Sequence, residues 1–116
     1  MHSPLSAKHK KLFEDSSNRI FTSQISLMEL AIKKNLNKLP NFVPSIETIA
    51  TTWLNNGFDL MKLSDRHIFS YQDLPLLQEH RDPFDRFLIA IAKVENLTIL
   101  TTDSKFSLYS SIVRLL

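Results

Sequence analysis

Apolar and polar positions recur along the chain with two different spacings. Apolar side chains three or four residues apart, together with capping residues such as Ser45 and Ser64, are typical of helices. Short apolar runs bounded by polar residues are typical of strands. The pattern predicts helices over residues 5–15, 24–39, 45–54, 64–71 and 83–95. It predicts strands over residues 19–23, 58–63, 97–101 and 112–115.

Strands that alternate with helices predict an α/β fold, in this case a three-layer domain in which helices flank a parallel sheet. Residues 1–116 are expected to form one such domain, because the chain has no internal repeat and no long linker. Sheets of this kind usually begin with a fully apolar central strand, and residues 1–4 contain none. We therefore expect the sheet to lack its first central strand, which would leave the domain incomplete at the N-terminus.

Composition narrows the classes of function. The 116 residues include a single Gly, which excludes glycine-rich phosphate loops, and no Cys, which excludes disulfides and thiolate zinc sites. The absence of Cys fits a reducing cytoplasm. No apolar run approaches the roughly 20 residues of a membrane span, so a membrane partner is not expected. The net charge of +2 permits nucleic acid as a partner but does not argue for it.

Three aspartates lie in the segment HRDPFDRFLIAIAKVENLTILTTD, residues 80–103. Asp82 precedes a proline and is interpreted as the N-cap of the helix that follows. Asp85 heads the apolar face of that helix, where a carboxylate is costly unless something pairs with it. It either acts as a capping acid or belongs to a functional site. Asp103 comes just after a predicted strand, where α/β sheets bind ligands, or else it caps the next short helix.

Glu29 presents a similar choice in an earlier helix. Its neighbours on the same helix face, Ile25, Ile32 and Leu36, are all apolar. Glu29 therefore either belongs to a site or forms an exposed ion pair with Lys33, one turn further along the helix.

In a parallel sheet, the three acids can lie at the same edge. Carboxylates without a basic partner repel one another, and a hard divalent cation relieves that repulsion. All-oxygen ligation suits Mg²⁺ or Mn²⁺, and such an ion can activate water against a phosphodiester. Together, Glu29, Asp85 and Asp103 indicate metal-dependent hydrolysis. If they are only caps, the chain is instead an α/β binding domain of another kind.

Nearly the whole chain is covered by three segments in a recognisable order: LSAKHKKLFEDSSNRIFTSQISLMELAIKKNLNKLP, GFDLMKLSDRH and HRDPFDRFLIAIAKVENLTILTTDSKFSLY. These segments resemble the PIN-domain family, and within it the VapC-type toxins of bacterial toxin–antitoxin pairs. The resemblance implies a small α/β domain whose clustered acids hold Mg²⁺ or Mn²⁺ and cleave RNA. It also implies a homodimer that is inhibited by a small antitoxin protein.

The resemblance also assigns individual residues. Glu29 matches the acid of the second family helix, Asp85 the acid that opens the helix after DPF, and Asp103 the acid after the last core strand. Thr101 matches the Ser/Thr position two residues before that acid. These four residues are the expected catalytic residues, and the three acids among them are the expected metal ligands.

The chain departs from the family at its start. Family members begin with a central strand that ends in an Asp, and this acid has no counterpart here; Asp15 does not take its place. We therefore expect nuclease activity to be impaired. The alternative is a non-catalytic, truncated remnant or decoy that binds the antitoxin or a sister protomer. His67 and His80 lack the spacing of metal ligands and are given no role.

Overall fold

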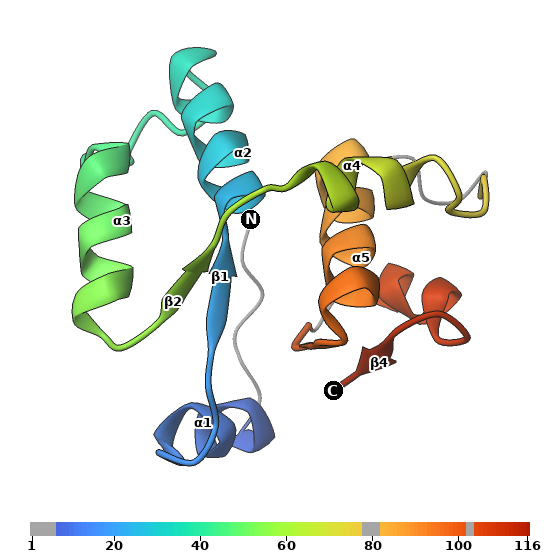
Figure 1. Cartoon of the computed structure of the whole chain (residues 1–116). Helices are drawn as coiled ribbons and strands as arrows, with labels where there is room; N and C mark the ends of the chain where they lie inside the picture. Colours follow the sequence, from blue (N-terminus) through green and yellow to red (C-terminus); the bar gives the residue numbers. More distant parts are fainter. Residues whose placement is uncertain (1–6, 78–81, 102–103) are drawn as a thin grey trace. The chain divides into compact units, whose positions relative to one another are not determined.

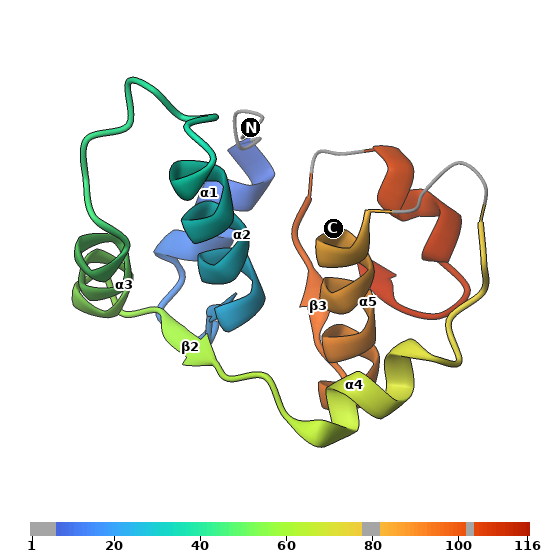
Figure 2. The same ribbon diagram turned by 90° about the horizontal axis from the view of Figure 1, so that it is seen from above.

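The computed structural model describes residues 7–77, 82–101 and 104–116. The chain divides into two compact units, whose α-helices and strands are labelled in Figures 1 and 2. The first, the central unit, is Arg19–Leu63. The second, the terminal unit, combines Met1–Asn18 with Ser64–Leu116.

The central unit is built around a pair of parallel strands. Its elements are β1 Phe21–Ser23, α2 Gln24–Asn35, α3 Ile46–Asn55 and β2 Asp59–Met61. In the pair, Phe21 lies opposite Asp59 and Ser23 lies opposite Met61. The two helices form the crossover that parallel strands require, and they contact each other (Figure 1).

Local signals set the ends of the helices in the central unit. The hydroxyls of Ser23 and Ser45 cap α2 and α3 by accepting backbone N–H groups, each at 3.1 Å. Helix α2 ends at Asn35, before the predicted residue 39, because Asn37 adopts a left-handed backbone with φ of 57°. Asn tolerates this conformation better than most residues, so the helix stops there.

The terminal unit contains a second pair of parallel strands. Its elements are α1 Ala7–Glu14, α4 Asp65–Tyr71, α5 Pro83–Glu95, β3 Thr98–Ile99, the 3₁₀-helix η1 Ser104–Tyr109 and β4 Arg114–Leu115. Thr98 lies opposite Arg114, and Ile99 lies opposite Leu115. Helix α4 packs on α5, as Figures 1 and 2 both show.

Helix α5 forms the centre of the core of the terminal unit. Its buried apolar side chains pack with residues from η1 and the adjoining segments: Leu74, Ile89, Ala90, Ala92, Phe106, Tyr109 and Val113. The helix runs from Pro83 to Glu95 as predicted, and Asn96 ends it in a left-handed conformation with φ of 56°.

The predicted α/β class with parallel strands is confirmed. Among the described residues the strands form two separate pairs, β1–β2 and β3–β4. Each strand is shorter than its predicted range; β3, for example, covers Thr98–Ile99 rather than residues 97–101. The reason is that an apolar run becomes strand only where a partner is hydrogen-bonded to it, and β4 is itself two residues long. That the whole chain forms one domain stays a prediction.

Candidate functional site

Two aspartates lie at the start of α5. The carboxylate of Asp82 accepts hydrogen bonds from the backbone N–H of Phe84 at 2.9 Å and of Asp85 at 3.3 Å. The interpretation of Asp82 as the N-cap is therefore confirmed. Asp85 lies half-buried in the first turn. Asp82 thus provides the cap, and the role of Asp85 in binding a ligand stays a prediction.

Thr101 lies just beyond the carboxyl end of β3. Its N–H donates to the carbonyl of Leu116 at 3.3 Å, and the N–H of Leu116 donates to the carbonyl of Ile99 at 3.0 Å. The pairing of the two segments therefore continues to Thr101, at the edge where α/β sheets bind ligands. Asp103 lies outside the described residues, and η1 begins immediately after it at Ser104.

His9, from α1, reaches the same carbonyl. Its Nε2 lies 2.8 Å from the oxygen of Leu116, and the side chain is buried. A carbonyl oxygen only accepts, so Nε2 carries the proton in this bond. Sequence reasoning missed this contact because the two residues are 107 positions apart. Helix α1 is thereby held beside the end of the β3–β4 pair, near Thr101.

Asp15 directly follows α1 and stabilises a turn. Its Oδ1 accepts a hydrogen bond from the hydroxyl of Ser17 at 2.7 Å and another from the Ser17 backbone N–H at 2.9 Å. These two bonds lower the pKa of the Asp15 carboxyl below its ordinary value. The carboxylate thus has a local structural role, which agrees with leaving it out of the candidate acids.

Glu29 lies in α2, in the central unit. Its Oε2 is 3.3 Å from Nζ of Lys33, so the ion pair expected as the structural alternative is present. The two side chains are half-buried, and an i,i+4 pair of this kind contributes about a few tenths of a kcal/mol to helix stability. The Glu29 neighbours Ile32 and Leu36 are 42% and 55% exposed, so this face of α2 does not bury the acid, and the metal role of Glu29 stays a prediction.

The candidate site residues divide between the two units. Glu29 belongs to the central unit, while Asp85 and Thr101 belong to the terminal unit. Within residues 7–77, 82–101 and 104–116, no three His, Asp or Glu side chains form a group that could hold a metal ion. The predicted set includes Asp103, which lies beyond those residues. The donor atoms of this predicted set are carboxylate oxygens, the ligands that Mg²⁺ and Mn²⁺ prefer.

Arg86 is a buried cation that sequence reasoning did not single out. Only 6% of the residue is exposed. Its Nη1 donates to the carbonyl of Pro75 at 2.9 Å and to the hydroxyl of Tyr109 at 3.1 Å, and its guanidinium lies 5.3 Å from the centre of the Tyr71 ring. Burial lowers the pKa of Arg86, but the two tyrosines raise it, and the net pKa lies above its ordinary value. Arg86 is therefore a charged group inside the protein.

His67, to which no role was assigned, is a structural residue of α4. It is 1% exposed, and its Nδ1 accepts a hydrogen bond from the backbone N–H of Ser64 at 3.0 Å. Nε2 therefore carries the proton of the neutral ring and donates it to Oε2 of Glu95 at 2.7 Å. The three-residue spacing from Ser64 to His67 matches a capping box, a signal that could have revealed half of this arrangement.

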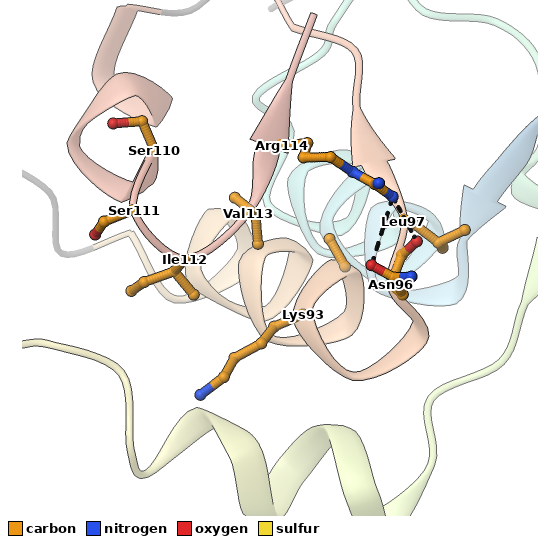
Figure 3. A pocket seen from close by; sticks show the side chains of 9 residues that line it. Lys93, Asn96, Leu97, Ser110, Ser111, Ile112, Val113 and Arg114 are labelled. Atoms are coloured by element: carbon orange, nitrogen blue, oxygen red, sulfur yellow. Dashed lines mark hydrogen bonds between the residues drawn. The ribbon is translucent and has the colours of Figure 1, made fainter.

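A pocket of about 220 Å³ lies at the other end of α5 (Figure 3). Lys93, Ser110, Ser111 and Arg114 are among its polar lining residues. Nη2 of Arg114 donates to the backbone carbonyl of Asn96 at 3.0 Å. From the first turn of α5 to Asn96 the helix rises roughly 16 Å at 1.5 Å per residue, so this pocket is separate from the candidate acid of that turn.

A family model described as PIN domain matches residues 2–111. Comparison with curated proteins and with solved structures found no significant match. PIN domains are in general nucleases that depend on divalent metal ions and act on RNA or DNA, so the match indicates a nuclease-type function. Among the helices of the described residues, none is long and apolar enough to cross a membrane.

Proposed function

We propose that this chain, which belongs to the PIN-domain family, is a Mg²⁺- or Mn²⁺-dependent endoribonuclease. The observation that carries the proposal is the position of Asp85: a half-buried acid in the first turn of α5, beside a different residue that provides the cap. We further propose that the protein is a VapC-type toxin, acting in the cytoplasm as a homodimer under the control of an antitoxin.

In this proposal Glu29, Asp85 and Asp103 hold the metal ion, and Thr101 steadies the site from the end of β3. The bound ion supplies the Lewis acidity that makes water a nucleophile towards a phosphodiester. The protein's own contribution, in this proposal, is to supply the three carboxylates as ligands for the ion. The hydrogen bond from the Thr101 N–H to the carbonyl of Leu116 supports this role, because it fixes the backbone two residues before Asp103.

Metal binding and RNA cleavage test the proposal together. Mn²⁺ binding is measured by calorimetry, and cleavage of a single-stranded RNA is measured with and without Mn²⁺. We expect Asp85→Asn to lower both the affinity and the rate at least about 100-fold, since even residues behind the ligands typically cost 10–100-fold. Asp73→Asn is the matched control, because Asp73 is an exposed acid of the same unit. If both variants lost Mn²⁺ affinity and cleavage rate equally, Asp85 would not belong to the metal site.

The second candidate is a non-catalytic PIN-like protein that binds an antitoxin or a sister protomer. Two consecutive apolar side chains on α4 favour it: Ile68 is 45% exposed and Phe69 is 61% exposed. Exposed apolar side chains that lie near one another often mark contact surfaces between proteins. Binding of a co-expressed antitoxin that is lost in Phe69→Ser, in a protein without Mn²⁺-dependent cleavage, would support this candidate over the nuclease.

A further inference from the structure

We infer that Arg86 is a positioning residue, which aligns the acids of the metal site by tying the first turn of α5 to η1 and to the segment after α4. The inference rests on the proposed function, because it concerns the acids assigned there. Arg86 itself touches neither metal nor RNA in this scheme. It acts through the backbone next to Asp85.

The contacts of Arg86 join the segments that carry the two acids of the terminal unit. Arg86 directly follows Asp85 in the first turn of α5. Its Nη1 donates to the hydroxyl of Tyr109, the last residue of η1, and η1 begins directly after Asp103. The same atom donates to the carbonyl of Pro75, in the segment that leads from α4 towards α5. One guanidinium thereby connects three segments that are far apart in the sequence.

The cap by Asp82 satisfies the backbone N–H groups of Phe84 and Asp85. This local cap does not tie the first turn of α5 to η1 or to the segment after α4, whereas the side chain of Arg86 does. Metal ligands and catalytic groups must be held to within roughly 0.5 Å, usually by a second layer of hydrogen bonds. Arg86 provides that layer one residue after Asp85, and Tyr109 extends it to η1.

The charge of Arg86 is balanced by neutral partners rather than by an acid. Among the described residues, no carboxylate lies within ion-pair distance of its guanidinium, although only 6% of the residue is exposed. The tyrosines outweigh the penalty of burial, since the net pKa of Arg86 lies above its ordinary value. An apolar side chain there would leave the carbonyl of Pro75 and the hydroxyl of Tyr109 without this donor. The planar guanidinium also gives the connection a fixed geometry.

The test compares metal affinity with stability in four variants. Arg86→Met removes the charge and the donors, Arg86→Lys keeps the charge, and Tyr109→Phe removes only the hydroxyl. The matched control is His67→Gln, which disturbs the other end of α5, where His67 binds Glu95. Each variant is assayed for Mn²⁺ affinity by calorimetry and for its urea unfolding midpoint.

We expect Arg86→Met to weaken Mn²⁺ binding roughly 10–100-fold, the usual effect of losing a residue behind a metal ligand. Tyr109→Phe should weaken it by a smaller factor, and Arg86→Lys should recover part of the loss. His67→Gln should lower the urea midpoint and leave Mn²⁺ affinity unchanged. This pattern separates positioning from general destabilisation, because the control loses stability without losing the metal.

Two outcomes would overturn the inference, and they are distinguishable. If the wild-type protein binds Mn²⁺ and Asp85→Asn abolishes binding, while the variants of Arg86 and Tyr109 bind as tightly as wild type, only the positioning role is wrong. If the wild-type protein does not bind Mn²⁺ at all, the proposed function fails and the inference fails with it. Should Arg86→Met not fold, the Mn²⁺ affinity of Tyr109→Phe decides between these outcomes, since that variant lacks only one oxygen atom.

Discussion

Single polar side chains cap the starts of helices in this protein. The carboxylate of Asp82 accepts two backbone N–H groups at the start of α5, and the imidazole of His67 accepts one at the start of α4. The first arrangement uses an exposed side chain, and the second uses a buried one. Their contributions to stability should differ accordingly, because an unpaired donor costs more where water cannot replace the lost partner.

Asp82→Ala should lower the free energy of unfolding by about 1 kcal/mol, the usual cost of losing an N-cap side chain. Asp82→Ser keeps an acceptor in the same place and should stay close to wild type. Urea unfolding followed by circular dichroism measures both variants. A stability for Asp82→Ala equal to that of wild type would show that α5 does not depend on this cap.

His67→Ala should cost about 2–4 kcal/mol, because it leaves a cavity in a buried position as well as two hydrogen-bonding groups without their partner. The groups are the backbone N–H of Ser64 and the carboxylate of Glu95. Glu95→Gln removes only the charge from the second bond and should cost less. Thermal and urea unfolding of both variants give the comparison, and equal losses would contradict the capping role.

Helices are the elements that the sequence predicts best, because their ends depend on neighbours within four residues. Ser64 and Asp82 mark the starts of α4 and α5 where the pattern places them. Strands were predicted too long, because their extent depends on a partner such as β4 that is distant in sequence. For the same reason the sequence did not predict the role of Arg86, since its partner Tyr109 lies 23 positions away. The place of Asp85 within its helix was predictable, and its surroundings were not.

The apolar face of α5 should carry most of the stability of the terminal unit. Ile89 is fully buried in the core cluster, so Ile89→Ala should cost about 2–5 kcal/mol. Leu76→Ala, in the same unit but at a side chain that is 78% exposed, should change the free energy of unfolding by less than about 0.5 kcal/mol. Urea midpoints of the two variants test this, and similar losses would mean that α5 is not the centre of the core.

At the scale of the whole molecule, burial is uneven between the two units. Among the described residues, the buried apolar side chains of the terminal unit include the seven of its core cluster, whereas the central unit contributes Ile25. Apolar burial is the main favourable term in folding, so the central unit has less to hold it together. Local opening should therefore be easier in Arg19–Leu63 than around α5.

Hydrogen exchange measures this difference directly. Backbone amides in the middle of α2 and α3 should exchange faster than those of Ile89–Ala92 under native conditions, because opening a segment with few buried contacts costs less free energy. Mass spectrometry of peptides from each unit gives the rates. Uniform protection across both units would show that the chain opens only as one cooperative block.

Ser23 is at once the last residue of β1 and the cap of α2, so no loop separates the strand from the helix that carries Glu29. Because no loop residues are available to adjust at this junction, an insertion or deletion between positions 23 and 29 changes the helix itself. It would rotate every later side chain of the helix by about 100° around its axis. Natural variation in length should therefore occur elsewhere, for instance in the connector between α2 and α3, and not at the junction of β1 and α2.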